Sequence, residues 1–310
     1  MRPKDIIVVG TRNSQLALTQ TSQTITALKS LCPGPEFVVK TISTAGDRVP
    51  NNEALADHQG IFVKELQDAL LQGSIDIAVH SLKDMPCEIM AGLELGAVSA
   101  RVTPQDAFLA RDNVRFAGLK PNARIGTSSI RRRAQVLLAR PDLQVVGLRG
   151  NVDTRVRKLQ AGEVDAIIIA AAGLTRIGLD NLITELMPFD IMLPAPCQGA
   201  LGIEIRQGDQ QLKEIIAKFD HQPTRLAIMA ERAFLSGLGG GCSLPVGAYA
   251  EVSGRVLTLR VQVVSPNGDK SLRRTVSGDV NNADDLGQEL ARELLTSEGE
   301  WLQQALGIKA

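Results

Sequence analysis

The chain has 310 residues, of which 44% are hydrophobic and 3% aromatic, and its 34 basic and 34 acidic residues give a formal net charge of zero. This length suits two or three domains, and the composition is ordinary for a soluble globular protein. Zero net charge and few aromatic side chains argue against a general nucleic-acid-binding surface. The most apolar run, residues 166–174, is far shorter than a membrane span, so we also expect no membrane partner.

The N-terminus and the cysteines bear on where the protein works. Only four successive apolar residues precede Gly10, too few for the core of a signal peptide, so we expect no export. The cysteines form neither a CxxC pair nor a zinc-type spacing, which favours reduced thiols over disulfides. We expect three of them to be buried filler: Cys32, Cys87 and Cys197. The sequence thus predicts a cytoplasmic protein without a metal site, with a processed plastid protein as the alternative.

Two pairs of similar segments predict a repeated α/β lobe. Residues 5–20 and 123–139 each read as an apolar strand, a Gly-Thr turn followed by serine, and a helix. Residues 70–81 and 159–173 each read as a helix end, a glycine and an aspartate that opens a β-branched strand. Such continuous apolar strands are typical of parallel sheets covered on both faces. We therefore expect two related lobes that divide near residue 100.

Polar side chains follow the predicted strands of the first lobe. They are Arg12, Ser14, Ser81, Lys83 and Asp84. Lys83 offers a point charge for a carboxylate, and Asp84 is the best candidate general acid or base. Asp84 reads equally well as a turn or helix-start aspartate ahead of Pro86, and spacing alone leaves both readings open. His80, on an apolar strand, is expected to be a hydrogen-bonded core histidine rather than a ligand.

The second lobe carries an excess of positive charge. Residues 124–176 contain nine arginines and one lysine against four acidic residues. Such a patch on a neutral protein suits a small, multiply anionic ligand better than a polymer. Arg131, Arg132 and Arg133 fall in the first turn of a predicted helix, where cations oppose the helix dipole. A bound carboxylate would offset that conflict; a solvated basic face is the alternative, and we prefer it for Arg133.

Other polar residues of the second lobe also follow predicted strands. Ser128 or Ser129, just after Thr127, can cap the helix that carries the arginines. Arg149 and Arg155 follow a second apolar strand, and Arg176 follows a third; the full set is Thr127, Ser128, Ser129, Arg149, Arg155 and Arg176. Ligands of open α/β sheets bind beyond the carboxyl ends of strands. We therefore expect an anion site on each lobe and a cleft between the two.

The last third of the chain reads differently. Residues 254–278 contain two strand patterns around a Pro-Asn-Gly-Asp turn, and residues 282–295 form an amphipathic helix with acids in its first turn. This predicts a small α+β domain. At its start, three glycines precede Cys242, which leaves the sulfur open to a bulky partner. A nucleophile or a covalent anchor are both possible roles, and no nearby histidine supports the first.

Eight motifs in this order resemble the porphobilinogen deaminase family, also called hydroxymethylbilane synthases. They are GTRNSQLAL, GIFVKEL, DIAVHSLKDMP, GTSSIRRRAQ, LRGNVDTR, AAGLTRIGL, PAPCQGALGIE and GGGCSLPVGAYA. The match runs from about residue 5 to the end and is weakest after Ala250. Each motif alone is weakly specific, whereas the ordered set is highly specific.

The resemblance implies three domains, of which two are periplasmic-binding-protein-like α/β lobes around a cleft and the third is a small C-terminal α+β domain. The implied bounds are 1–99 with 200–219 for domain 1, 100–199 for domain 2 and 220–310 for domain 3. The return of the chain to the first lobe after residue 199 is not visible in the periodicity. We expect a monomer.

The resemblance also implies the activity, that of a transferase in tetrapyrrole (haem and chlorophyll) biosynthesis. Such enzymes condense four porphobilinogen units, each with loss of ammonia, onto a dipyrromethane cofactor held by a thioether at the cysteine matching Cys242. Water then releases the linear hydroxymethylbilane. Every pyrrole carries an acetate and a propionate, so the growing chain is a polyanion, in agreement with the basic patch.

Individual roles follow from the motif positions. Asp84 matches the catalytic carboxylate. The residues expected to bind the cofactor are Ser81, Lys83, Thr127, Ser128, Ser129, Arg131, Arg132, Gly150 and Arg155. Those expected to bind the substrate are Arg12, Ser14, Phe62, Arg149, Arg155, Arg176 and Gln198. One departure is the stretch Asp57–Gly60, where the family commonly has Gly-Gly-Lys-Gly: the lid lysine is missing, and Gln59 or His58 substitutes weakly.

Two other functions compete with this interpretation. A binding protein with the same two lobes would explain the anion sites, but it leaves the glycine-flanked cysteine unexplained. A nucleic-acid-binding protein built on SIRRRAQ would conflict with the zero net charge and the low aromatic content. The mass of the purified protein separates the first alternative from the enzyme, because only the enzyme carries a cofactor.

Overall fold

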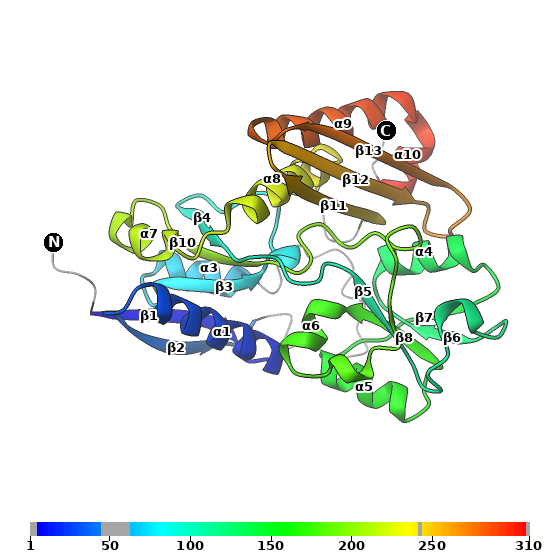
Figure 1. Ribbon diagram of the computed structural model, residues 1–310, viewed down its shortest axis with the longest axis horizontal. Helices are drawn as coiled ribbons and strands as arrows, with labels where there is room; N and C mark the ends of the chain where they lie inside the picture. Colours follow the sequence, from blue (N-terminus) through cyan, green and yellow to red (C-terminus); the bar gives the residue numbers. More distant parts are fainter. Residues whose placement is uncertain (1–4, 45–62, 241–243, 308–310) are drawn as a thin grey trace. The chain divides into compact units, whose positions relative to one another are not determined.

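A computed structural model describes residues 5–44, 63–240 and 244–307 of the chain (Figure 1). The expectations for His58, Gln59, Phe62 and Cys242 therefore fall outside the described residues. The chain divides into two compact units, Met1–Arg101 with Ala200–Arg225, and Val102–Gly199 with Leu226–Ala310. The chain passes from the first unit to the second after residue 101 and returns after residue 199.

The first unit contains a five-stranded sheet in its described part. Its strands are β1 (Ile6–Arg12), β2 (Glu36–Ile42), β3 (Ile77–Ser81), β4 (Leu93–Val98) and β10 (Leu201–Arg206). The strand order is β2-β1-β3-β10-β4. β1 pairs in parallel with β2 and β3, whereas β10 is antiparallel to both β3 and β4. The predicted parallel pairing is confirmed for β1, β2 and β3 but not for β10, because the strand that follows the return crossover enters the sheet in the opposite direction.

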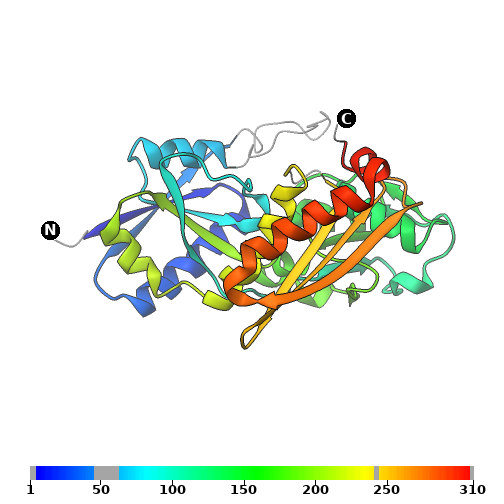
Figure 2. The ribbon, with the colours of Figure 1, turned by 90° about the horizontal axis from the view of Figure 1, so that it is seen from above.

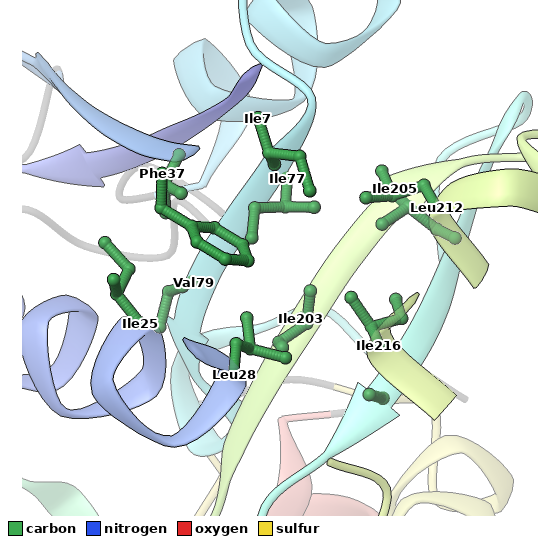
Figure 3. Close-up of a cluster of buried hydrophobic side chains, with 12 residues drawn as sticks. Ile7, Ile25, Leu28, Phe37, Ile77, Val79, Ile203, Ile205, Leu212 and Ile216 are labelled. Atoms are coloured by element: carbon green, nitrogen blue, oxygen red, sulfur yellow. The ribbon is translucent and has the colours of Figure 1, made fainter. Parts of the chain in front are cut away.

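Helices cover both faces of this sheet, as the apolar strands predicted. They are α1 (Gln15–Leu31), α3 (Lys64–Leu71) and α7 (Gln210–Ala217). On one face, Leu28 of α1 and Ile216 of α7 pack against strand residues such as Ile77 and Ile203, as Figure 3 shows. On the other face, α3 packs its buried leucines against Ile75 and its neighbours.

The second unit repeats the arrangement of the first. Its strands are β5 (Asp106–Ala110), β6 (Arg124–Gly126), β7 (Gln144–Val146), β8 (Ala166–Ala170) and β9 (Glu185–Leu186), and its helices in this part are α4 (Ile130–Ala139), α5 (Val152–Gln160) and α6 (Ala171–Arg176). The order is β7-β6-β8-β5-β9, with β6 parallel to β7 and β8 and with β5 antiparallel to β8. The predicted relationship between the lobes is confirmed strand by strand, because β1 and β6 occupy equivalent places.

The C-terminal part of the second unit is α+β, as predicted. Its elements are α8 (Gln222–Gly237), β11 (Val246–Ser253), β12 (Val256–Val264), β13 (Ser271–Asp279), α9 (Ala283–Ser297) and α10 (Gly299–Leu306). The strands form an antiparallel sheet in chain order, and α9 runs along it (Figure 2). Gly268 in the hairpin has φ +77, the left-handed conformation that its glycine permits.

Residues 226–310 and 102–199 share one compact unit, although the sequence places a domain boundary near residue 220. Arg273 of β13 donates to the carbonyl oxygens of Phe189 (2.7 Å) and Asp190 (2.9 Å). The Phe189 ring also stacks on Tyr249 at 4.7 Å between centroids. Side chains of the last 85 residues therefore hold the chain that precedes the return crossover.

The burial expected for three cysteines is confirmed for one of them only. Cys197 is buried, as expected, but Cys32 and Cys87 are only half-buried, so the interpretation as core filler is wrong for those two. Cys32 is the C-cap of α1, and Cys87 lies in the irregular chain before β4. Within the described ranges, no helix combines the length and apolar character needed to cross a bilayer.

Candidate functional site

In the first unit, polar residues gather at one edge of the sheet. Arg12 is the last residue of β1 and Ser81 is the last residue of β3; because these neighbours are parallel, both ends lie at the same edge. Ser14 begins α1 as its N-cap, and its Oγ accepts from the backbone N of Ala17 at 3.2 Å. Arg12, Ser14 and Ser81 are all half-buried. The strand-end placement expected from the sequence is thus present.

Lys83 and Asp84 lie in a single 3-10 turn, Leu82–Asp84, directly after β3. Buried Leu82 anchors the turn, and its backbone N donates to the carbonyl of Ala200 at 3.1 Å. The amide of Gln20 donates to Ser81 Oγ at 2.9 Å and so fixes the residue that precedes the turn. Among the described residues, none is hydrogen-bonded to the half-buried Asp84 carboxylate. The catalytic role of Asp84 stays a prediction.

His80 has the structural role that the sequence predicts. Its Nε2 lies 3.0 Å from Oε2 of Glu204, and both side chains are buried. The amide of Gln67 donates to the other carboxylate oxygen of Glu204 at 2.8 Å. The side chains of Gln67 (α3), His80 (β3) and Glu204 (β10) thereby supply one another's hydrogen bonds, and β3 leads directly to the turn that carries Asp84.

In the second unit, the N-terminus of α4 follows β6 through Thr127, Ser128 and Ser129. Ser129 is the N-cap, and its Oγ accepts from the backbone N of Arg132 at 3.4 Å. Its own N–H donates to Oγ1 of buried Thr127 at 3.2 Å. Ser128 is exposed. This is the helix start predicted from the sequence, with hydroxyl groups and backbone N–H groups side by side.

Arg131 and Arg132 lie inside the protein rather than on a solvated face. Arg131 Nη1 lies 2.8 Å from Oδ2 of Asp106 and donates to the carbonyl of Leu193 at 2.6 Å. Arg132 donates to Oδ1 of Asp106 through Nε (3.1 Å) and Nη2 (2.8 Å). The conflict between these cations and the helix dipole is therefore offset in part by a carboxylate of the protein itself. Arg133, in contrast, is exposed, as expected.

Asp106 was missed by sequence reasoning. It opens β5 and is completely buried. Burial alone would raise the pKa of this carboxyl, but the charges of Arg131 and Arg132 outweigh burial and hold it well below the usual range. Burial in turn lowers the pKa of Arg131. The available signal was an aspartate at the start of an apolar strand, a position that needs a partner when it is buried.

Arg149 and Gly150 lie between β7 and α5, and Arg155 lies within α5. Arg155 Nε donates to the carbonyl of Gly150 at 2.7 Å, and Lys158 Nζ lies 3.5 Å from the carbonyl of Arg149. Gly150 has φ +117, and a Cβ there would lie 2.7 Å from Cγ2 of Thr154. The position therefore requires glycine.

Arg176 and Gln198 complete the expected set in the second unit. Arg176 ends α6, after β8, and donates to the carbonyl of Gly199 at 2.9 Å. Burial lowers its pKa to about 10, so it is still a cation at neutral pH. Gln198 Nε2 donates to the carbonyl of Pro104 at 2.8 Å and to Oδ1 of Asp106 at 2.9 Å. The structure thus joins Gln198 to the buried arginine pair.

The two sets of side chains share one chemistry. Each combines guanidinium or ammonium groups with hydroxyl groups at the carboxyl ends of parallel strands, a donor set that fits carboxylates. β6 is parallel to both β7 and β8, so the residues that follow these strands lie at one edge. Within the described ranges, no group of three or more His, Cys, Asp and Glu side chains is arranged to hold a metal ion.

Comparison with known proteins decides the family. The family model described as "Porphobilinogen deaminase, dipyromethane cofactor binding domain" matches residues 7–214, and "Porphobilinogen deaminase, C-terminal domain" matches residues 225–296. A porphobilinogen deaminase of Thermus thermophilus is 48% identical over 95% of this chain and 97% of its own. The chain belongs to the porphobilinogen deaminase family. A second relative with this name, from Geobacter sulfurreducens, is 46% identical over 94% of this chain and 92% of its own.

Likeness to solved structures is weaker and carries no weight in the assignment. Substrate binding domain 2 of GlnP from Lactococcus lactis, in an open conformation, matches 69% of this chain and 88% of that one. The two are 12% identical, and the TM-score is 0.41.

The porphobilinogen deaminase match confirms the resemblance seen in the sequence, and residues 7–214 form the family's cofactor-binding domain. That range includes every expected site residue of both units except Cys242, which lies within the range of the family's C-terminal domain.

Beyond the motifs, the structure adds Glu231 of α8. This carboxylate is completely buried and accepts from the backbone N of Cys197 and of Ala250, each at 2.6 Å. Cys197 itself has φ 65, a conformation that few non-glycine residues adopt. Glu231 thus holds the chain beside Gln198.

Proposed function

We propose that this protein is a working porphobilinogen deaminase. It joins four porphobilinogen units head to tail, each with loss of ammonia, on a dipyrromethane bound to the protein, and then releases the linear tetrapyrrole by hydrolysis. The family match over almost the whole chain carries this conclusion. The basic, hydroxyl-rich strand ends of both units support it, because the substrate and its product carry two carboxylates on every pyrrole.

Cys242 is the proposed point of attachment. Two glycines that lead to it, Gly239 (φ 94) and Gly240 (φ 66), have left-handed backbone conformations, and a Cβ on Gly240 would meet nothing within 4 Å. The chain at Gly240 is therefore uncrowded, which supports a bulky group near this point of the sequence. When bound, the dipyrromethane supplies the pyrrole end to which the first unit is joined.

The arginines and their neighbours bind and orient carboxylates. For the cofactor, the proposed groups are Ser81, Lys83, Thr127, Ser128, Ser129, Arg131, Arg132, Gly150 and Arg155. For the substrate, they are Arg12, Ser14, Phe62, Arg149, Arg155, Arg176 and Gln198. Partial burial strengthens each charge-assisted hydrogen bond relative to water. Several such contacts together exclude water from the acetate and propionate groups and hold the pyrroles in register.

Asp84 is the proposed catalytic residue. Its carboxylate accepts hydrogen bonds from pyrrole N–H groups and stabilises the positive charge that develops as ammonia leaves. It can also take up the proton that the new pyrrole–pyrrole bond releases. The short turn anchored by Leu82 fixes the backbone of Asp84, so little reorganisation is needed during the reaction.

Incubation with porphobilinogen followed by intact-mass measurement tests the proposed function. We expect the purified protein to carry one dipyrromethane and to gain mass in steps of one to four substrate units less ammonia. A freshly purified, folded protein of unmodified mass that binds porphobilinogen without forming a covalent bond would contradict it and favour a binding protein with the same lobes.

We further propose that the enzyme acts as a cytoplasmic monomer without nucleic acid. The zero net charge and the bacterial origin of the relatives named above support this proposal. Light scattering should give a mass near 33.2 kDa, the mass of one chain. The absorbance spectrum of the same sample should show no contribution from nucleic acid. A mass twice as large would refute the monomer.

A further inference from the structure

Asp106 is a point on which several expected site residues converge. Three side chains contact its carboxylate: Arg131, Arg132 and Gln198. Both of its oxygens are engaged, Oδ2 by Arg131 and Oδ1 by Arg132 and Gln198. None of the three partners lies near Asp106 in sequence, and no motif pointed to it.

The backbone of Asp106 is fixed on both sides within the sheet. It pairs with Ala170 of β8 in the antiparallel register, and its carbonyl accepts from the backbone N of Met187 at 2.8 Å. The carboxylate is therefore a rigid reference for the guanidinium groups, which reach it from the first turn of α4. The partner side chains are long and flexible, whereas Asp106 is short and strand-bound.

Charge makes this anchoring necessary. Two buried guanidinium groups face a single carboxylate, so the cluster keeps an excess of one positive charge. The helix dipole opposes both cations, and Asp106 offsets only part of that cost. Nη1 of Arg131 contacts Asp106 and the carbonyl of Leu193. Nε and Nη2 of Arg132 both donate to Asp106. Each guanidinium has five N–H donors in a fixed plane, so these contacts also set the direction of the remaining donors.

We propose that Asp106 is a positioning residue for the carboxylates of the dipyrromethane: by fixing the guanidinium planes of Arg131 and Arg132, it orients their remaining N–H groups before the cofactor binds. The inference rests on the proposed function, and it adds a residue that acts through the arginines without touching the ligand. Gln198 supports the same carboxylate from the chain held by Glu231.

The test compares three variants purified in the same way. Asp106→Asn keeps the shape and removes the charge, and Asp106→Glu keeps the charge and moves it by one methylene. Asp142→Asn is the matched control, because it removes an aspartate from an arginine pair at the surface, with Arg140 at 2.7 Å. For each, the folded protein is isolated by gel filtration, its melting temperature is recorded, and intact mass gives the fraction that carries dipyrromethane. Steady-state kinetics then give KM and kcat per loaded molecule.

We expect the folded Asp106→Asn protein to carry at least tenfold less cofactor than the wild type, while Asp142→Asn is loaded normally. Asp106→Glu should restore loading to within threefold of the wild type, but with kcat per loaded molecule at least fivefold lower and KM within twofold, because the substrate carboxylates have other partners. Normal loading of the folded Asp106→Asn protein would overturn the proposal. If that variant does not fold, wild-type loading and kcat in Asp106→Glu would overturn it instead.

The wild-type protein in the same experiment separates this inference from the proposed function. A wild type that carries no dipyrromethane contradicts the function itself. A loaded wild type beside unaffected Asp106 variants contradicts only the positioning role.

Discussion

At the scale of single residues, two aspartates lie in different environments, and we propose a different task for each. Asp84 is half-buried in a short turn without a hydrogen-bond partner among the described residues, and Asp106 is completely buried between two arginines. An aspartate without protein partners can interact with a reacting group, whereas one with every oxygen engaged can only hold its neighbours. The sequence identified the first through its motif but offered no partner for the second, because a pairing across 25 residues depends on the fold.

Asp84→Asn should lower kcat by about 10² to 10³, the effect of removing one preorganised electrostatic group in other enzymes. The amide keeps the shape but cannot stabilise a developing cation. The rate must be measured on protein whose cofactor is shown by mass to be attached. Asp112→Asn, at an exposed position, serves as the control and should be unchanged. Turnover of the Asp84 variant within twofold of the wild type would remove Asp84 from the mechanism.

Asp106 should also make stability depend on pH in the acid range. Its pKa in the folded protein is depressed below the ordinary value of 3.8, so its stabilising contribution is present above that value and is lost as the pH falls below it. Breaking a buried pair costs about 3–5 kcal/mol. Urea unfolding should therefore show a large deficit of Asp106→Asn at neutral pH that shrinks near pH 3. An equal deficit at both pH values would show that the carboxylate charge is not what stabilises the fold.

At the scale of elements, local signals predicted the strand–helix units β1–α1 and β6–α4 and the C-terminal hairpin. The Gly-Thr turn and serine cap mark the starts of α1 and α4, and the Pro-Asn-Gly-Asp turn marks the junction of β12 and β13. Strand direction was not predictable, because an apolar run looks the same in a parallel and an antiparallel strand. β5 pairs antiparallel with β8, and β10 pairs antiparallel with β3; the apolar pattern could not show either direction.

The packing of α9 on α8 depends on a helical glycine. A Cβ on Gly287 would lie 2.4 Å from the carbonyl oxygen of Ala230 and 2.8 Å from the backbone N of Phe234. Gly287→Ala should lower the free energy of unfolding by about 1–3 kcal/mol through overpacking, although alanine is intrinsically the better helix former by about 1 kcal/mol. Chemical denaturation measures this. Gly147→Ala is the control, since its Cβ would meet nothing within 4 Å. A stabilised Gly287→Ala protein would contradict the close packing.

At the scale of the whole molecule, two of the three crossings between the units, those after residues 101 and 199, have the same structural result. After residue 101 the first strand of the second unit is β5, and after residue 199 the first strand of the first unit on return is β10. β5 lies antiparallel to β8, and β10 lies antiparallel to β3. Expected site residues follow the ends of both β8 and β3. The family resemblance implied the return crossover, whereas periodicity alone indicated contiguous lobes, since it carries no information on which segments meet.

The central claim is that a sulfur of this chain carries a pyrrole primer whose acid groups are neutralised by its arginines. The most direct measurement is the intact mass of Cys242→Ser beside the wild type, with tetrapyrrole formation followed in the same samples. The account predicts a wild type heavier than its sequence by one dipyrromethane, and a folded variant with no added mass and no product. A Cys242→Ser protein that produces tetrapyrrole at the wild-type rate would contradict it.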